Sequence, residues 1–115
     1  MKDVDLNQTN VILVGDNGTP NNMLQAPFSN GHGKGSLYEG GIRVPMVAAG
    51  PDVIARGTND SLVHVVDLYA TILTLAGIDP GDALPADTML DSRDLYPALI
   101  GGHVHGCVVS RIVAW

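Results

Sequence analysis

The sequence predicts a small α/β domain, because two short apolar segments are followed by a segment with helical periodicity. The apolar segments are Val11–Val14 and Val44–Ala49, and each is bounded by residues that favour turns. From Asp67 onward the apolar residues recur with the spacing of one helix face. A chain of 115 residues is long enough for one domain, and no change in composition indicates a second.

The first predicted strand is Val11–Val14, whose continuous apolar run predicts a strand covered on both faces. Residues 16–35 follow and are rich in Gly, Asn, Pro and Ser, which predicts a long loop. Such loops are uncommon in compact domains unless they are functional. The second predicted strand, Val44–Ala49, ends at a Gly-Pro-Asp turn, and residues 59–61 are expected to form another turn.

The predicted helix begins at Asp67, which is expected to be its N-cap. Gly77 is expected to be the C′ residue that ends it. The apolar stripe consists of Leu68, Ile72, Leu75 and Ala76. An acidic connector, residues 79–91, leads to a short predicted helix over residues 94–100, interrupted at Pro97, and residues 107–113 are expected to form a last strand.

Charge and cysteine content exclude several classes of function. The formal net charge is −6, and the six Lys and Arg residues are spread thinly, which disfavours a nucleic-acid or anionic-membrane partner. A single Cys excludes an internal disulfide. No apolar stretch approaches the roughly 20 residues needed to span a bilayer, and the first residues do not form a signal peptide.

Asp16 and Asn17 directly follow the first predicted strand. A carboxylate and a carboxamide at the carboxyl end of a buried strand form an oxygen-rich corner, which suits a hard divalent cation. Residues 15–18 also suit an ordinary turn, because Asn and Gly tolerate left-handed backbone conformations. On spacing alone the turn is favoured.

Lys34 lies between two glycines, at the start of a segment that reads K-G-S-L-Y-E-G-G-I-R-V-P. A lone lysine in such a loop is usually solvated. Flanking glycines, however, let the backbone approach a ligand while the ammonium acts as a point charge on an anion. Tyr38, Glu39 and Arg43 are expected to be architectural, with Glu39 holding Arg43 or a backbone amide.

Together these segments resemble the sulfatase family, in which a strand ends in S-D-N-G and a later loop reads G-K-G-[ST]-x-Y-E-G-G-x-R-x-P. Residues 66–78 are similar to the family stretch V-D-L-x-P-T-[IL]-L-x-L-A-G, and residues 91–99 to a drifted D-G-x-S-L-x-P-L-L. Gly15 stands where the family usually has Ser. The resemblance predicts that residues 1–115 are a single, partial catalytic domain, from the middle-to-late part of a sulfatase.

The resemblance implies part of an alkaline-phosphatase-like α/β fold, with three layers and a mixed sheet flanked by helices. It implies that Asp16 and Asn17 bind calcium, or in some members magnesium. Lys34 is expected to contact the sulfate group and to stabilise charge on the leaving oxygen, with His32 assisting in a minor role. The whole enzyme is expected to hydrolyse sulfate monoesters of a small molecule or a sulfated glycan, in a secreted, periplasmic or lysosomal location.

The nucleophile of the family is a formylglycine made from the Cys of C-x-[PA]-S-R, normally well before the D-N-G strand. Residues 107–111 read C-V-V-S-R, but Val109 departs from the motif and the segment follows the Lys34 loop. We interpret Cys107 as a coincidence, since a β-branched run suits a buried strand in which Cys is a small hydrophobe; a permuted enzyme, in which Cys107 is the nucleophile, is the alternative. Formylglycine is therefore expected only upstream, and this chain alone is expected to be inactive. His103 and His105 form half of a transition-metal site or, more simply, a solvated loop.

Two other functions stay open. A phosphodiesterase or phosphonate hydrolase of the same superfamily would differ in the missing nucleophile, although residues 39–43 favour a sulfatase. A non-catalytic calcium- or anion-binding protein derived from a sulfatase is the alternative from another class. A domain without its central strands would also expose sheet edges, which predicts self-association.

Overall fold

The computed structural model describes residues 4–101 and 110–114, and side chains within residues 4–101. In chain order, the elements are β1 (Val11–Val14), the 3-10 helix η1 (Asn21–Met23), α1 (Glu39–Ile42), β2 (Val44–Ala49), β3 (Gly57–Val63), α2 (Asp67–Leu75), α3 (Tyr96–Leu99) and β4 (Ser110–Ala114). The predicted α/β character is confirmed, and β2 has the predicted bounds. Cys107, His103 and His105 lie outside the described residues.

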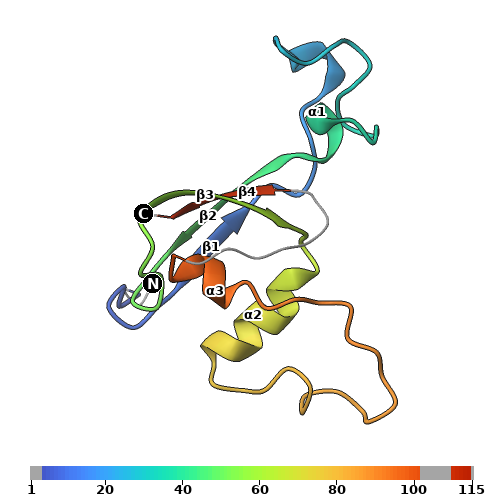
Figure 1. The fold of residues 1–115 in the computed structure, drawn as a ribbon. Helices are drawn as coiled ribbons and strands as arrows, with labels where there is room; N and C mark the ends of the chain where they lie inside the picture. The colour runs from blue at the N-terminus through green and yellow to red at the C-terminus, as the bar shows by residue number, and fades with distance from the viewer. Residues whose placement is uncertain (1–3, 102–109, 115) are drawn as a thin grey trace.

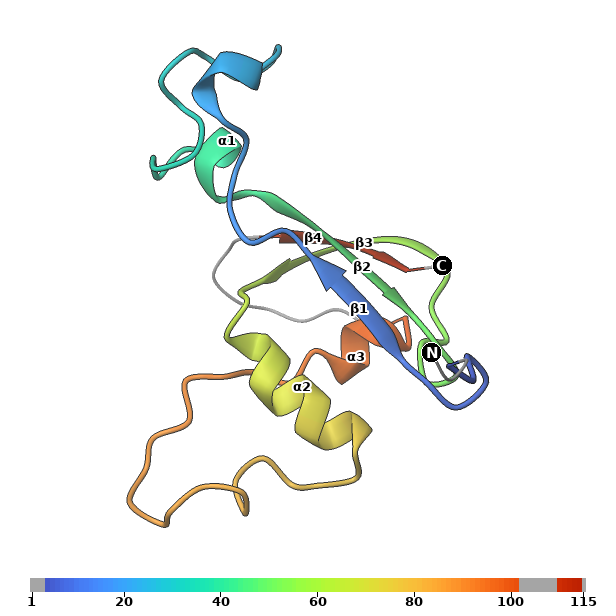
Figure 2. The ribbon, with the colours of Figure 1, turned by 180° about the vertical axis from the view of Figure 1, so that it is seen from behind.

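The four strands form one mixed sheet in the order β1-β2-β4-β3. β1 is antiparallel to β2, β2 is parallel to β4, and β4 is antiparallel to β3. Figures 1 and 2 show α2 and α3 on one face of this sheet, while η1 and α1 extend beyond one end of it. The described residues thus form two layers, with a separate projection built from the segment between β1 and β2.

β1 is an edge strand, and only one of its faces is covered. Ile12 and Val14 pack against the core, whereas Val11 is 46% exposed and Leu13 is 68% exposed. The expectation that this strand is covered on both faces is therefore wrong for the described residues. Alternate side chains point to opposite faces of a strand, and α2 and α3 both lie on the same face of the sheet (Figure 1).

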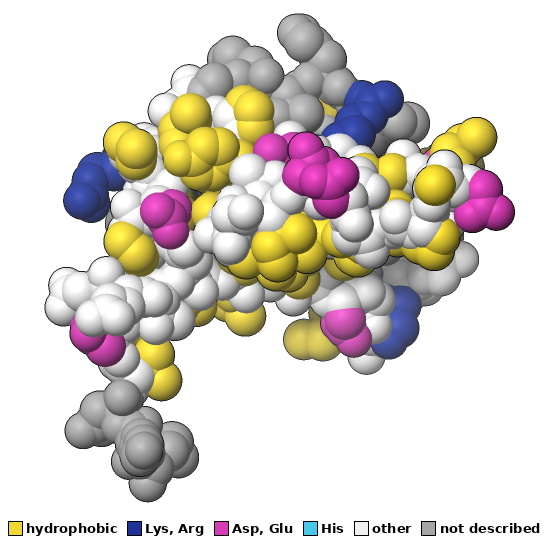
Figure 3. Space-filling model, turned by 90° about the horizontal axis from the view of Figure 1, so that it is seen from below, with side chains coloured by type: hydrophobic (Ala, Val, Ile, Leu, Met, Phe, Trp, Pro, Cys, Tyr) yellow, Lys and Arg dark blue, Asp and Glu magenta, His cyan; other side chains and the backbone are white. Residues whose placement is uncertain are grey.

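The core lies between the sheet and helices α2 and α3. It consists of side chains from β2, β3, α3 and the segments next to them: Met46, Ala48, Val53, Val63, Leu95, Ala98 and Leu99. Leu99 is fully buried and Met46 is 2% exposed. Exposed hydrophobic side chains also lie on the helix side, where Figure 3 shows them scattered among acidic groups. Ile72 of α2 is 55% exposed.

α2 begins at the predicted residue, but its buried face differs from the predicted stripe. Asp67, Ala70 and Thr71 are buried, while Leu68 and Leu75 are only partly buried against the core. The reason is the connector, which returns along α2: Ser92 Oγ accepts a hydrogen bond from the Ala70 amide at 2.9 Å. Polar groups on the helix therefore meet polar groups of the connector rather than solvent.

The N-terminus of α2 differs from the sequence prediction, whereas its C-terminus agrees with it. Asp67 is not the N-cap, since Val66 takes that position without a side-chain hydrogen bond. Instead the Asp67 carboxylate accepts hydrogen bonds from the amides of His64, at 2.7 Å, and Arg93, at 3.0 Å. The C-terminus is as predicted: Gly77 has φ +74°, and its amide donates to Thr74, which is a Schellman ending.

Two other predictions are corrected. Residues 59–61 lie inside β3 rather than in a turn, at a register shift between Asn59 and Val63. Asn59 fits there because its Nδ2 donates to the Ala98 carbonyl oxygen at 3.2 Å, a partner far away in the sequence. Pro97 does not interrupt α3 but lies in its first turn, where a missing amide costs little. Within the described part of the chain, no helix has the length and apolar character needed to cross a membrane.

Candidate functional site

Asp16, Asn17 and His64 lie at the same end of the sheet, beyond the last residues of β1 and β3. Asp16 and Asn17 follow β1, and His64 follows β3. Val44 at the start of β2 and Val63 at the end of β3 both pair with Ser110 of β4, and β1 runs antiparallel to β2. The register therefore places at one end of the sheet polar residues that are almost fifty positions apart in the chain, although three strand spacings separate them.

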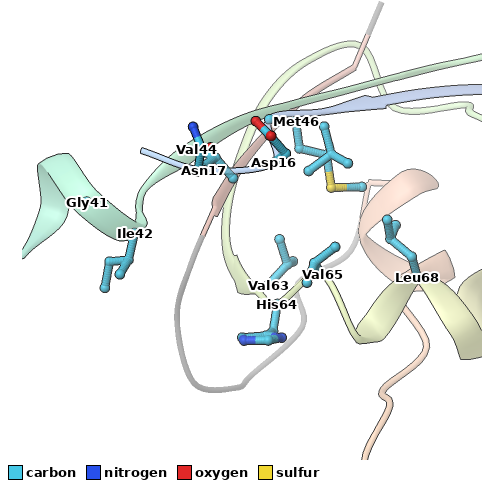
Figure 4. A pocket seen from close by; sticks show the side chains of 12 residues that line it. Asp16, Asn17, Gly41, Ile42, Val44, Met46, Val63, His64, Val65 and Leu68 are labelled. Atoms are coloured by element: carbon cyan, nitrogen blue, oxygen red, sulfur yellow. The ribbon is translucent and has the colours of Figure 1, made fainter. Parts of the chain in front are cut away.

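A pocket of about 580 Å³ opens at this end of the sheet. Its walls are mostly apolar, and it is lined by Val14, Gly15, Asp16, Asn17, Gly41, Ile42, Val44, Met46, Val63, His64, Val65 and Leu68. Figure 4 shows Asp16 and Asn17 together on one side of the pocket and His64 on the other, with Val63 between them and Leu68 farther away, on α2. The predicted metal corner is thus part of the wall of a pocket.

The donor atoms of Asp16 and Asn17 suit a hard cation. Both residues are exposed, and the Asp16 carboxylate has no hydrogen bond or ion pair with any other described residue. Asn17 Nδ2 donates to the Gly18 carbonyl oxygen at 3.2 Å, so the carboxamide nitrogen is occupied and the oxygen Oδ1 is left for another partner. One charged and one neutral oxygen group are ligands that Ca²⁺ and Mg²⁺ prefer.

His64 does not belong to the same ligand set. Three strand spacings separate β1 from β3, which is roughly 14 Å, and one ion bonds its ligands at about 2.5 Å. His64 Nδ1 accepts a hydrogen bond from the Val66 amide at 3.2 Å, so its ring is oriented by the chain before α2. Among the described residues, no group of three or more His, Cys, Asp and Glu side chains could hold a metal.

Lys34 is close to the metal corner through its backbone. Its amide donates to the Thr19 carbonyl oxygen at 2.7 Å, and Thr19 is two residues after Asn17, which limits their Cα separation to about 7 Å. The Lys34 side chain is exposed and has no ion pair with a described carboxylate. Lys34 does not line the pocket itself.

Glycines let the segment between β1 and β2 pack against itself. A Cβ on Gly18 would overlap the carbonyl oxygens of Gly40 and Gly41, and one on Gly33 would overlap that of Thr19. Gly35 is different, because its φ of +89° places it in the left-handed region that favours glycine. Gly33, which precedes Lys34, is therefore required by contacts within the chain.

The two architectural expectations for this segment have different outcomes. Glu39 holds Arg43, as predicted, through an ion pair of 3.0 Å between Oε2 and Nη1. Tyr38 does more than begin α1: its ring stacks on that of His32, with centroids 3.5 Å apart and planes 8° from parallel. His32 is partly buried, and its ring nitrogens make no hydrogen bond to any residue the structure describes.

Two features of the site were not predicted from the sequence. His64 could have been found, since it is a polar residue that directly follows a strand. The sequence, however, predicts a turn over residues 59–61, within β3, and so the end of this strand is not recognised. The stack of His32 on Tyr38 joins residues six positions apart in an irregular loop, and no periodicity of helix or strand marks such a pair.

Comparisons with known proteins show which family this chain is similar to. The sequence model of the Sulfatase family matches residues 2–78. Rat N-acetylgalactosamine-6-sulfatase is 36% identical over 103 residues, human arylsulfatase A 39% over 99 residues, and rat steryl-sulfatase 37% over 109 residues. The aligned parts cover 84%, 84% and 86% of this chain but only 18% of each relative. No solved structure gives a significant match.

Proposed function

The chain belongs to the sulfatase family, and from this premise we propose that it supplies part of the metal and sulfate site of a calcium-assisted, formylglycine-dependent sulfatase. The matched family region, residues 2–78, contains both the Asp16–Asn17 corner and the Lys34 loop. The chain spans 18% of the length of the three relatives named above. Its own contribution is therefore a set of binding groups, with the nucleophile expected from another part of the protein.

We propose that Asp16 and Asn17 hold a calcium ion, with magnesium as the alternative. The two residues are exposed and adjacent in the chain, and neither the Asp16 carboxylate nor Asn17 Oδ1 makes a hydrogen bond or ion pair with other described residues, which is the support for this role. When bound, such an ion neutralises negative charge on the sulfate oxygens. Two protein groups are fewer than the six to eight oxygens that Ca²⁺ takes, so the remaining ligands would come from substrate, water and other segments.

Lys34 is proposed to bind the sulfate group and to stabilise the leaving oxygen. Its ammonium is exposed and unpaired among the described residues, and its backbone is fixed to Thr19, next to the metal corner. A cation held in place before the reaction stabilises developing negative charge without having to reorganise. His32, two residues before Lys34, is proposed to assist the same oxygens in a minor role.

The fold proposal is the alkaline-phosphatase-like arrangement with three layers. The mixed sheet and the helices on one face support it, and the apolar outer face of β1, with Leu13 68% exposed, supports a further layer there. β1 and β3 are the edge strands of the described sheet. Self-association of the isolated chain through these edges is proposed for the same reason.

The substrate class is proposed to be sulfate monoesters, either small molecules or sulfated glycans. The names of the three relatives refer to an amino sugar, an aryl group and a sterol, so the alcohol varies while the sulfate is common to all. The proposed metal site at Asp16 and Asn17, and the ammonium of Lys34, would bind the sulfate, which all these substrates share. A non-catalytic calcium- or anion-binding role remains the alternative, because the departure of C-V-V-S-R from the nucleophile motif leaves this chain without a nucleophile of its own.

The main support for the proposal is the hydrogen bond from the Lys34 amide to the Thr19 carbonyl oxygen, which holds Lys34 near the metal corner. A chimera tests it: the aligned segment of rat N-acetylgalactosamine-6-sulfatase is replaced by this chain, and hydrolysis of a sulfate ester is measured. We expect activity that falls by about 10² to 10³ with Lys34→Ala, as for removal of one transition-state donor. Arg56→Ala, which removes an exposed cation outside this segment, is the matched control and should retain activity.

An active chimera that tolerates Lys34→Ala and Asp16→Ala would contradict the proposal. Binding to the isolated chain provides a second readout if the chimera does not fold. Ca²⁺ and sulfate should then perturb the NMR signals of Asp16, Asn17 and Lys34, and sulfate binding in the absence of a response at Lys34 would count against its role. The isolated chain itself is expected to hydrolyse no sulfate ester.

A further inference from the structure

The rings of His32 and Tyr38 close the base of the loop that carries Lys34. The rings are parallel within 8°, with centroids 3.5 Å apart, and residues 33–37 lie between them in the chain. Tyr38 is tied to α1, because its carbonyl oxygen accepts the amides of Gly41, at 2.8 Å, and Ile42, at 3.1 Å.

His32 is anchored to the same short helix from the other side. A Cβ on Gly40 would lie 2.7 Å from the His32 carbonyl oxygen, so the backbone of His32 passes directly against α1. The His32 amide donates to the Ser29 carbonyl oxygen at 3.1 Å. Both ring-bearing residues are therefore fixed at the backbone, and the stack forms between two anchored positions.

Stacking orients the imidazole without using its polar atoms. The face of the ring contacts Tyr38, while the two nitrogens lie in the ring plane and make no hydrogen bond to any described residue. Lys34 is two residues after His32, and its ammonium is also unpaired within the described chain. An imidazole N–H and an ammonium that are close in the chain and both free suit an oxyanion with several acceptor oxygens.

We propose that Tyr38 is a positioning residue, which stacks on His32 so that the imidazole and Lys34 bind one sulfate-type oxyanion together. This inference rests on the proposed function, since it takes Lys34 as the sulfate-binding group. It gives His32 a defined partner and gives Tyr38 a role beyond the start of α1. Tyr38 acts through His32 and does not contact the anion.

The experiment uses the 115-residue chain and inorganic sulfate, followed by NMR of the His32 ring and the Lys34 side chain. Tyr38→Phe keeps the aromatic face and Tyr38→Leu removes it, while Tyr69→Leu removes another half-exposed tyrosine, on α2. We expect ring-current shifts of the His32 protons in the unchanged chain and in Tyr38→Phe, and their loss in Tyr38→Leu. Sulfate affinity should fall roughly 2- to 12-fold in Tyr38→Leu, the cost of immobilising one side chain on binding.

A double-mutant cycle separates positioning from loss of structure. In a His32→Ala background, Tyr38→Leu should have no further effect on sulfate affinity. If Tyr38→Leu weakens sulfate binding equally with and without His32, its effect does not pass through the imidazole, and the inference is overturned.

Two other outcomes also decide the matter. If sulfate perturbs Lys34 equally in the unchanged chain and in Tyr38→Leu, the positioning role fails while the proposed role of Lys34 stands. If sulfate does not perturb Lys34 in the unchanged chain, the proposed function fails at this residue, and the inference fails with it.

Discussion

The sheet with its two helices and the glycine segment, residues 15–43, are held together by different kinds of contact. The sheet buries large side chains such as Met46, Leu95 and Leu99. In the glycine segment the buried residues are Gly18, Gly33 and Gly40, and no larger residue is buried there. One region is shaped by apolar side chains, and the other by backbone contacts that only glycine permits.

This difference explains where the candidate functional groups lie. Asp16, Asn17 and Lys34 are all exposed and all belong to the glycine segment. A backbone that packs against itself fixes the positions of such side chains without covering them, so they are free to bind a ligand. An apolar core of the usual kind would have needed larger side chains at the same place.

The largest expected effect is in the sheet region. Leu99→Ala should lower the free energy of unfolding by about 2–5 kcal/mol, because it leaves a cavity at a fully buried site. Denaturant unfolding measures this. Leu37→Ala is the control, since Leu37 is 91% exposed, and its effect should stay within about 0.5 kcal/mol. Equal effects for the two leucines would mean that the sheet region has no well-packed core.

In the glycine segment, the free energy of unfolding should be most sensitive to an added methyl group, because the backbone packs closely there. A Cβ on Gly41 would overlap the carbonyl oxygens of Ser36 and Gly33, so Gly41→Ala is expected to cost about 1–3 kcal/mol. Hydrogen exchange should locate the change in residues 15–43 and leave α2 protected. Gly81→Ala is the matched control, because its nearest contact is the Asp79 side chain at 3.2 Å; comparable exchange in both variants would contradict the glycine-packing account.

Asp67 is the exception within the sheet region, since a buried carboxylate there joins three segments. Asp67→Asn replaces one of the two oxygens that accept the amides of His64 and Arg93, and should cost about 1–3 kcal/mol. Thermal unfolding measures this. Asp87→Asn, at an exposed position of the connector, should have little effect. A neutral result at Asp67 would show that the connector is held by its other contacts.

The smallest expected effect is at the ion pair of the glycine segment. Glu39 and Arg43 are about half exposed, so Glu39→Gln should cost no more than about 0.5 kcal/mol. The difference should shrink at high salt, because exposed charges are screened, and it should vanish in an Arg43→Gln background. A larger loss that does not depend on salt would mean that Glu39 has a structural role beyond this pair.

The sequence predicted what local chemistry determines. The bounds of β2, the start of α2 and the ending at Gly77 follow from apolar runs and turn residues within a few positions. The exposed face of β1 and the inclusion of residues 59–61 in β3 depend on partners far along the chain, such as the Ala98 carbonyl that binds Asn59. No local pattern contains that information.

In the candidate site, too, the features marked by local sequence were predicted and those that depend on tertiary contacts were not. The Asp16–Asn17 corner and the Lys34 loop were predicted from the residues and their resemblance to a family, and the structure places them near each other through Thr19. The glycine contacts and the His32–Tyr38 stack were not predicted, because they arise from tertiary contacts inside an irregular loop. The metal role of Asp16 and Asn17 and the sulfate role of Lys34 stay predictions.

A Ca²⁺ titration of the isotopically labelled chain by NMR, with Asp16→Ala for comparison, would show whether Asp16 and Asn17 bind the metal. The connector carries Asp79, Asp82, Asp87 and Asp91 and serves as an acidic reference within the same molecule. We expect saturable shifts centred on Asp16 and Asn17, and we expect Asp16→Ala to abolish them. Saturable binding at the connector with no response at Asp16 and Asn17 would contradict it.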